Sequence, residues 1–404
     1  MNKKWVILII MSISELMVMS LWFSASAIAP QLAVTWKIRG ADVIVVTLMV
    51  QIGFVFGSLL SASIGLADLI NPRYLFTLSA ILSAFMNILF VVMYHYFVIE
   101  LILMFLTGAL MAGIYPVSVM VVSAWFPRGK GLAIGIVIAG LTLGTALPHA
   151  ILSLPFIRHW QYLMEFSSLL SVIGGILVYS VLKNYSKKIK ANKFEFKMVG
   201  RIIRNKSLMK ANTGYFGHMW ELYAMWAWMP VFLISSFSFY YSGRSLLYIA
   251  GISSFAIIGM SGVVGSILGG IISDRIGRTF STSIYMGISG TLSILIGFTY
   301  GYIPVITIIA GIVWGITVIA DSAQFSTAVT ELADESIRGS ALTFQMAIGF
   351  LITIASIYLI GVIKEMYGWH WAFSILSLGP AIGIIAMLSL RKDHDAYLMC
   401  NGLK

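Results

Sequence analysis

The chain has 404 residues, of which 59% are hydrophobic and only 10% are charged, against roughly 25% charged residues in a soluble domain. So few charges cannot cover a globular surface in water, which excludes an ordinary soluble protein and makes lipid the solvent for much of the chain. The net charge of +11 is concentrated in residues 183–211, so it predicts no nucleic-acid partner.

Apolar runs long enough to cross a membrane, about 20 residues each, occur twelve times along the chain. In chain order the predicted spans are 5–29, 43–67, 74–95, 97–125, 131–155, 160–182, 212–236, 248–272, 281–302, 303–327, 339–364 and 371–390. Lys3 and Lys4 before the first run resemble the start of a signal peptide. Glu15 inside that run, and a copy of the segment later in the chain, instead indicate a retained first membrane helix.

Lysine and arginine predict the orientation, because cytoplasmic loops carry an excess of both. With the N-terminus inside, all but five of the 26 basic residues lie on the cytoplasmic side; the five are Lys37, Arg39, Arg158, Arg244 and Lys364. Every one of the 26 is assigned to the end of a span. We therefore predict a multi-pass protein of the inner (cytoplasmic) membrane with both termini in the cytoplasm.

The two halves of the chain repeat each other at an offset of 206 to 209 residues. Residues 15–22 match residues 221–228 in Glu, Leu, Met and Trp, and Asp68 after the second span matches Asp274 after the eighth. A duplicated six-helix unit is typical of secondary transporters. The predicted parts are an N-terminal bundle 1–182, a basic linker 183–211, a C-terminal bundle 212–390 and a tail 391–404.

The linker 183–211 contains ten basic residues and one acidic residue, Glu195. We interpret it as an orientation signal and a tether between the halves. The alternative is a patch that binds anionic lipid headgroups.

Residues 269–278, Gly-Gly-Ile-Ile-Ser-Asp-Arg-Ile-Gly-Arg, resemble the cytoplasmic loop signature of the major facilitator superfamily. The first-half copy, residues 65–73, has Asn71-Pro72 in place of the second glycine. The resemblance implies an all-α membrane fold with 12 transmembrane helices in two pseudo-twofold-related six-helix bundles, which we expect to be a monomer. It also implies gating-loop residues that set the inward–outward equilibrium; they are Asp68, Arg73, Asp274, Arg275, Gly277 and Arg278.

Ionisable side chains deep inside membrane spans are unfavourable, and each is a functional candidate by default. The deep set is Glu15, His149, His218, Glu221 and Asp321. Three other carboxyls, Glu100, Glu165 and Glu331, lie near span ends and are predicted to be interfacial.

Glu15 and Glu221 occupy equivalent positions in the two halves. The resemblance places them on the cavity-lining first and seventh helices, so we expect them on opposite walls of one cavity. Helical spacing adds further residues to the walls; they are Tyr215, His218 and Trp228 on the seventh helix, Trp22 on the first, and Asp321 and Gln324 on the tenth.

Burial disfavours the charged form of a carboxyl, so such groups exchange protons near neutral pH. We therefore predict that Glu15, Glu221 and Asp321 couple transport to protons, with His218 as a partner of Glu221 or as a second proton site. The alternative is that each carboxyl is protonated and bonds a neighbouring helix. His149 follows Pro148, and its alternative role is to satisfy a backbone carbonyl that the proline leaves free.

These features predict a proton-coupled secondary transporter that moves a small solute by alternating access, with no cofactor, no dedicated metal site and no enzymatic activity. No arginine is embedded in the membrane core, which disfavours a small inorganic anion. Antiporters of the superfamily that the chain resembles often carry a Gly-Pro step in the fifth helix; Gly144 and Pro148 are separated here, so the resemblance favours uptake by symport. The alternatives are a proton-antiport efflux carrier for organic cations, a divalent-metal carrier and a non-transporting receptor or assembly protein.

Overall fold

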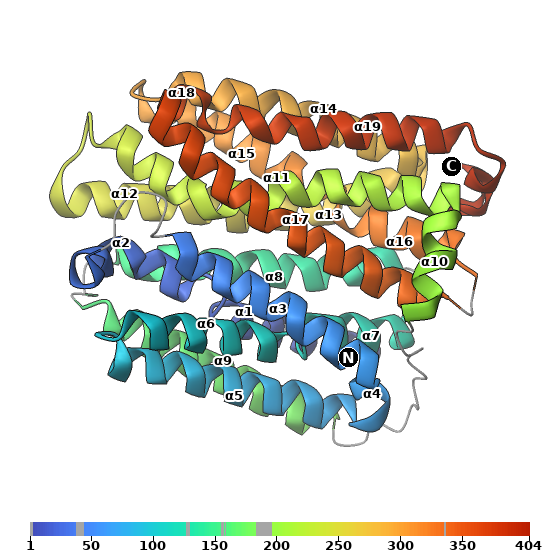
Figure 1. The fold of residues 1–404 in the computed structure, drawn as a ribbon, viewed down its shortest axis with the longest axis horizontal. Coiled ribbons are helices and arrows are strands. Elements are labelled where there is room, and N and C mark those ends of the chain that lie inside the picture. Colours follow the sequence, from blue (N-terminus) through green and yellow to red (C-terminus); the bar gives the residue numbers. More distant parts are fainter. Residues whose placement is uncertain are drawn as a thin grey trace.

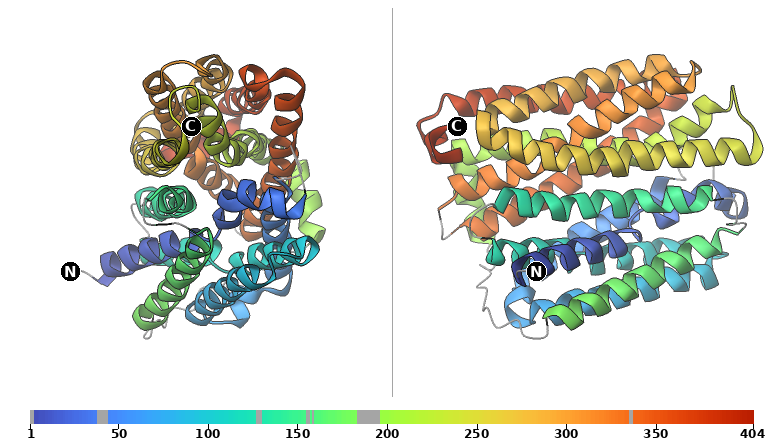
Figure 2. Two further views of the ribbon diagram at one scale, coloured as in Figure 1. Left: turned by 90° about the vertical axis from the view of Figure 1, so that its left-hand side faces the viewer. Right: turned by 180° about the vertical axis from the view of Figure 1, so that it is seen from behind.

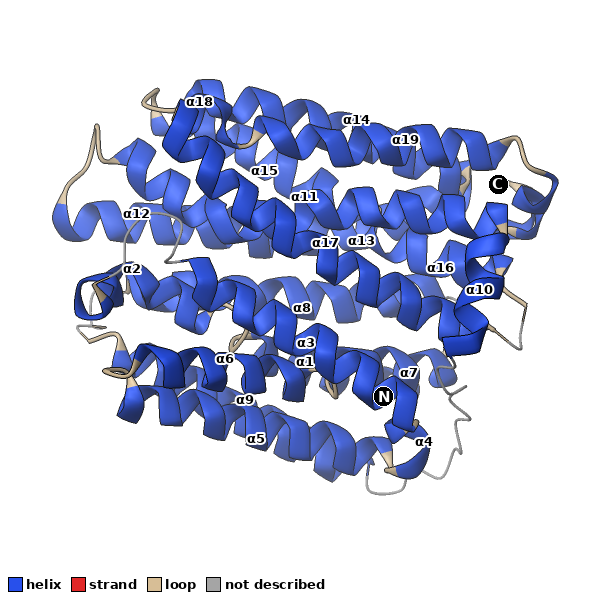
Figure 3. Cartoon of the chain, in the orientation of Figure 1, coloured by secondary structure: helices blue, strands red, loops and turns tan. Residues whose placement is uncertain are grey.

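The computed structural model describes residues 3–37, 44–126, 130–154, 157, 159–182, 196–334 and 337–404. All regular secondary structure in these ranges is helical, which confirms the all-α class (Figure 3). Figure 1 shows long, roughly parallel helices in two layers, one built from the first half of the chain and the other from the second. The views in Figure 2 show that α8 lies next to the second layer.

In the described ranges the first layer contains nine helices of very different lengths. They are α1 (Lys3–Met19), α2 (Ser24–Trp36), α3 (Val45–Ile64), α4 (Leu66–Leu69), α5 (Pro72–Met93), α6 (Phe97–Met111), α7 (Tyr115–Trp125), α8 (Lys130–Ser153) and α9 (Gln161–Val181). A short helix, α10 (Phe196–Arg204), precedes the second layer.

The second layer begins with α11, which is 32 residues long. Its α-helices are α11 (Lys206–Phe237), α12 (Gly243–Phe255), α13 (Ser261–Ile276), α14 (Arg278–Leu295), α15 (Pro304–Ala320), α16 (Ser322–Leu332), α17 (Arg338–Tyr367), α18 (Trp369–Ala372) and α19 (Leu378–Arg391). α11 starts six residues before the predicted span at 212, because Asn205 caps it by accepting a hydrogen bond from the Leu208 amide at 2.9 Å.

Eleven helices in the described part of the chain have the length and hydropathy of a membrane span. α11 is long enough but is not among them, because polar side chains such as Glu221, His218 and Asn212 lower its hydropathy. A multi-pass membrane protein is therefore confirmed, and twelve spans with cytoplasmic termini remain a prediction.

Several spans that the sequence predicts as continuous are interrupted near their middle. The first breaks at Ser20–Phe23, between α1 and α2, and the fourth at Ala112–Ile114, between α6 and α7. The tenth breaks at Asp321, between α15 and α16, and α12 joins α13 through a π-helical turn at Ala256–Met260. At a break, backbone N–H and C=O groups lose their hydrogen bonds within the helix. In membrane proteins such sites therefore line cavities or contact other polar groups.

Small residues bring the two layers into contact along α8 and α13. A Cβ added to Gly262 of α13 would lie 2.7 Å from Cβ of Thr142, and one added to Gly135 of α8 would lie 3.1 Å from the Ser266 carbonyl oxygen. In lipid the hydrophobic effect does not drive helices together, so their association depends on van der Waals contact, which close approach of this kind provides.

Side chains on the outside of the bundle are apolar, as a lipid-facing surface requires. Leu78 and Phe85 of α5 are 52% and 53% exposed, and Ile309 of α15 and Ile385 of α19 are 59% and 69% exposed. In water an apolar surface of this extent would drive association.

Both chain ends lie at the same end of the bundle, together with α10 (Figure 1). The last residues fold back onto the start of α14, where the Lys404 carbonyl oxygen accepts hydrogen bonds from the Thr279 amide at 3.2 Å and the Thr279 hydroxyl at 3.0 Å. The Cys400 amide donates to Oε2 of Glu331 on α16 at 3.2 Å. We call this the Arg278 end of the bundle, after the arginine that begins α14.

Gly269 and Gly270 of α13 offer a matched test of helix packing. A Cβ on Gly269 would overlap the Ala320 carbonyl oxygen, whereas one on Gly270 would approach nothing closer than 3.9 Å. We expect Gly269→Ala to destabilise the protein by about 1 to 3 kcal/mol through overpacking. Gly270→Ala should be neutral or stabilise by up to about 1 kcal/mol through helix propensity. Thermal unfolding of the detergent-purified variants measures both, and equal midpoints would contradict the close contact.

Candidate functional site

Glu221 is buried in the second layer, where neutral donors hold its carboxyl group. Its side chain is 1% exposed. Nε1 of Trp314 on α15 donates to Oε1 at 2.7 Å, and Oγ of Ser289 on α14 donates to Oε2 at 2.8 Å. The carboxyl group therefore connects α11 to two other helices of its own half, without a lysine or arginine among these contacts.

Glu15 has a similar environment in the first layer. Its side chain is fully buried, and Oγ of Ser118 on α7 donates to Oε2 at 2.5 Å. Its other oxygen, Oε1, has no hydrogen-bond partner among the described residues. The structure thus holds Glu15 and Glu221 each within its own half, and the hydrogen bonds it describes do not connect the two.

His218 pairs with Asp321 rather than with Glu221. Nδ1 of the histidine lies 2.8 Å from Oδ1 of the aspartate, and the two side chains are 1% and 3% exposed. Asp321 stands at the break between α15 and α16, which brings the tenth span against α11. The sequence placed His218 and Glu221 on one helical face, and only the tertiary structure selects the partner of each.

The predicted aromatic wall residues do not lie together in the structure. Trp22 packs against Phe54 from its own half and against Tyr223 and Phe350 from the other, with ring centroids 5.1 to 5.8 Å apart. This four-ring cluster packs side chains of the two halves against each other.

Tyr215 and Trp228 lie elsewhere along α11. Tyr215 contacts His218 and Phe325, with ring centroids 6.0 and 6.3 Å away. Trp228 donates from Nε1 to the Ile357 carbonyl oxygen at 2.8 Å and thereby joins α11 to α17.

Gln324 lies one helical turn beyond Asp321 and contacts the gating loop. Its Oε1 accepts a hydrogen bond from Nη1 of Arg278 at 2.6 Å. Arg278 also donates from Nε and Nη2 to the two oxygens of Glu331, both at 2.8 Å, in a bidentate pair. Arg278 is only 7% exposed, so this pair holds the start of α14 firmly against α16. We call Arg278, Gln324 and Glu331 the second-half latch.

The other residues of the predicted second gating loop lie around this latch. Asp274 is exposed and lies 3.6 Å from Nη1 of Arg278, and Arg275 is exposed. Gly277 has φ 90°, a conformation that favours glycine, and a Cβ there would overlap the Leu403 carbonyl oxygen.

The first-half copy of this loop has different contacts. Arg73 donates from Nε to the Tyr179 carbonyl oxygen at 2.6 Å, and its guanidinium lies 3.5 Å from the centroid of the Tyr179 ring. Asn71 caps α5 by accepting from the Arg73 amide at 2.9 Å, and Pro72 occupies the first helical position. The side chain of Asp68 lies outside the described part of the structure. Asn71-Pro72 therefore builds a helix start where the other half has its glycine turn.

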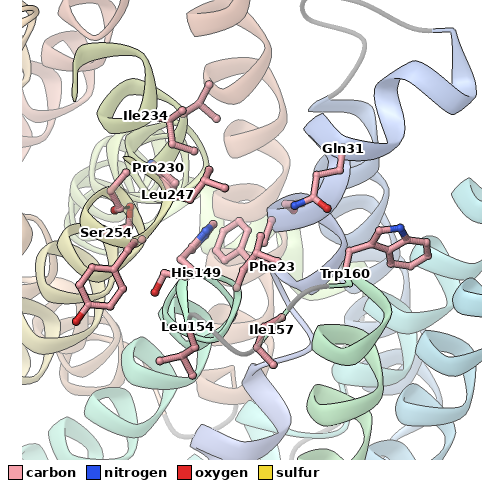
Figure 4. A pocket seen from close by; sticks show the side chains of 18 of the residues that line it. Phe23, Gln31, His149, Leu154, Ile157, Trp160, Pro230, Ile234, Leu247 and Ser254 are labelled. Atoms are coloured by element: carbon pink, nitrogen blue, oxygen red, sulfur yellow. Dashed lines mark hydrogen bonds between the residues drawn. The ribbon is translucent and has the colours of Figure 1, made fainter. Parts of the chain in front are cut away.

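His149 lies apart from the buried carboxyl groups, in a cavity of about 450 Å³ between the two layers. Its walls come from α2, α8 and the start of α9 on one side and from α11 and α12 on the other (Figure 4). Figure 1 shows α2 and the start of α12 at the end of the bundle opposite the chain termini. We call this cavity the vestibule. Of the candidate site residues that the sequence predicts, only His149 is among the described residues that line it.

The family model for the Major Facilitator Superfamily matches residues 10–326. The chain belongs to this superfamily. Among 275 solved chains that match, a mutant of the nucleoside transporter NupG aligns with a TM-score of 0.70 and 16% sequence identity, over 96% of this chain and 100% of that chain. At this identity the likeness shows the fold alone. No curated protein matches the sequence.

Membership of the superfamily makes the chain a secondary transporter and not an enzyme. The described residues contain no group of three or more His, Cys, Asp or Glu side chains arranged to hold a metal ion. Residues 269–278, on which the sequence resemblance rested, comprise the end of α13, the connecting residue Gly277 and the latch arginine Arg278, which begins α14.

Sequence reasoning missed three residues that contact the site. Ser118 and Ser289 hold the two glutamates, and Glu331, predicted to be interfacial, holds Arg278. Trp314, which also holds Glu221, lies at helical spacing from Asp321 and Gln324, on the face that the sequence predicts to line the pathway. Serine is too common in these spans to signal a carboxyl partner. The spacing of Glu331 from Gln324, seven residues or two helical turns, is the one signal that would have placed both on one face.

The latch can be tested with a neighbouring arginine as control. Arg278→Gln removes the bidentate pair with Glu331, and we expect a loss of about 1.5 to 3 kcal/mol, the usual contribution of hydrogen bonds to charged groups. Arg275→Gln removes an exposed charge and should change stability by less than about 0.5 kcal/mol. Thermal unfolding in detergent compares the two, and equal losses would argue against a specific role for Arg278.

Proposed function

We propose that the chain is a proton-coupled transporter that takes up a small solute by symport, with Glu221 and the His218–Asp321 pair as proton-coupling groups. The observation that carries this proposal is the environment of Glu221. The carboxyl group is 1% exposed and has only neutral donors, Trp314 and Ser289.

A carboxyl group in such a place responds strongly to water. Its charged and neutral forms differ greatly in free energy when it is dry and much less when water reaches it. A rocking motion that opens and closes a water-filled path therefore changes how tightly the group holds a proton. The same coupling makes proton binding favour one conformation over the other.

Asp321 directly precedes the short helix that carries two of the three latch residues, Gln324 and Glu331. α16 begins directly after Asp321, which contacts His218, and carries Gln324 and Glu331, which contact Arg278. A change in the His218–Asp321 pair that moved α16 would act on Arg278 within about three turns of helix. We infer that this helix links proton binding at the centre to opening at the Arg278 end.

The vestibule and the latch lie at opposite ends of the bundle. In the proposed orientation the Arg278 end faces the cytoplasm, as the distribution of basic residues predicts. The conformation described is then open towards the outside at the vestibule and closed at the centre by Trp22, Phe54, Tyr223 and Phe350. Rocking of the two halves would expose the central groups to the cytoplasm.

Glu221→Gln tests the proposal directly. Proteoliposomes with an acidic outside would be incubated with a mixture of nucleosides, carboxylates, amino acids, sugars and amines, and internal solutes quantified by mass spectrometry. We expect at least one solute to accumulate above the level without a pH gradient. Glu221→Gln should abolish this accumulation, because an amide keeps the size of the carboxyl group but cannot exchange the proton.

The matched control is Glu165→Gln, which neutralises an exposed carboxyl group and should leave accumulation unchanged. Full accumulation by Glu221→Gln would exclude the coupling role of Glu221. Export of a solute driven by an inward proton gradient would replace symport by antiport.

The two gating loops should differ in their sensitivity to substitution. Asp274 lies 3.6 Å from Arg278, whereas the first-half Arg73 bonds a backbone carbonyl group and an aromatic ring. We expect Asp274→Asn to slow transport by about two- to fivefold, the effect of an exposed charge pair. Asp68→Asn should slow it less. Initial uptake rates in the same proteoliposomes measure the difference, and equal slowing would contradict this ranking.

A further inference from the structure

Both halves of the chain line the vestibule, and the charge of its described lining is of one sign. Its ionisable lining residues other than a tyrosine are Arg244, His149 and His159, and no aspartate or glutamate is among its lining residues. Arg244 begins the first turn of α12 and is exposed, and no ion pair to it is described. The walls therefore carry positive charge that no carboxylate in the described lining compensates.

The buried carboxyl groups in the interior of the bundle do not line the vestibule. Glu15, Glu221 and Asp321 contact Ser118, Trp314, Ser289 and His218, none of which lines the vestibule. A cleft lined by one sign of charge concentrates ligands of the opposite sign. The vestibule therefore favours an anion, and the planar guanidinium group of Arg244 suits a carboxylate, to which it can donate two parallel hydrogen bonds.

The rest of the lining indicates an organic ligand. Phe23, Trp160, Pro230 and Leu247 present apolar surface in the same cavity (Figure 4). A volume of about 450 Å³ lies within the range of small-molecule sites. An inorganic oxyanion would leave that apolar surface without a partner, whereas a carboxylate with an apolar body contacts both kinds of wall.

The centre of the transporter adds a second constraint. None of the described contacts of Glu15, Glu221 and Asp321 is with lysine or arginine. An anion alone would therefore meet no fixed positive charge there except a protonated histidine. An anion accompanied by one proton crosses the same region with no net charge, which removes most of the electrostatic penalty.

We propose that the vestibule recognises a small organic carboxylate through Arg244 and that this class of anion is the solute that travels with the proton. The identity of the substrate rests on the proposed transport function; binding to the vestibule does not. The carboxylate is held first by Arg244 at the mouth, with its apolar part against Phe23 and Trp160.

The effect of ligand charge can be separated from the effect of ligand size with three ligands of nearly the same shape. Benzoate, benzamide and benzamidinium share a planar ring and a planar substituent, and they are anionic, neutral and cationic. We would measure the thermal stabilisation of the detergent-purified, full-length protein by each at neutral pH, because a ligand stabilises the state that it binds. We expect benzoate to stabilise most and benzamidinium least.

Arg244→Gln should weaken benzoate binding by about ten- to a hundredfold, the equivalent of one charge-assisted hydrogen-bonded pair. Arg244→Lys, which keeps the charge but not the fork, should restore part of the affinity. Lys364→Gln is the matched control, since it removes a predicted outer-side charge that does not line the vestibule; it should bind benzoate like the unmodified protein.

Stronger stabilisation by benzamidinium, or a benzoate shift that Arg244→Gln does not reduce, would overturn the proposal. Because binding is measured without a gradient, this result is independent of proton coupling. Loss of benzoate binding in Arg244→Gln together with full accumulation by Glu221→Gln would support the vestibule and reject the coupling role. The converse pair of results would reject the vestibule alone.

Discussion

Burial of carboxyl groups among neutral donors is the constraint on which the rest of this structure depends. Among the described residues no lysine or arginine bonds Glu221, and the indole of Trp314 and the hydroxyl of Ser289 donate to its two oxygens instead. These two hydrogen bonds join α14 and α15 to α11. Glu15 makes the same demand with one donor, Ser118. In a bilayer no water is at hand to replace a missing partner, so these contacts set both the packing and the chemistry.

One helix break recurs at equivalent positions in the two halves and carries an ionisable group in only one of them. The break between α6 and α7 at Gly113 and the break between α15 and α16 at Asp321 are 208 residues apart, the offset of the internal repeat. One half has a glycine there and packs it on Ser79, whereas the other has an aspartate and pairs it with His218. A duplicated backbone feature has thus become a titratable site in only one half.

The same divergence separates the two gating loops. Gly277 gives the second loop a turn that delivers Arg278 to Glu331, and the end of the chain packs over it. Asn71-Pro72 gives the first loop an ordinary helix start, and Arg73 bonds to Tyr179. The two halves share a fold, but the second holds the described ion-pair latch. The proposed transport cycle is therefore asymmetric in its control even though its architecture is duplicated.

The sequence by itself determined the membrane class, the all-helical fold and the superfamily, because long apolar runs, charge at their ends and a repeated loop signature are local properties of the chain. It also singled out the buried ionisable residues, since charge inside an apolar run is visible without a structure. Only the tertiary structure decided their partners: His218 with Asp321 instead of Glu221, Gln324 with Arg278 instead of a cavity, and His149 in the vestibule. Helical periodicity predicts which residues share one face of a helix. Which neighbouring helix contacts that face depends on packing between segments far apart in the chain.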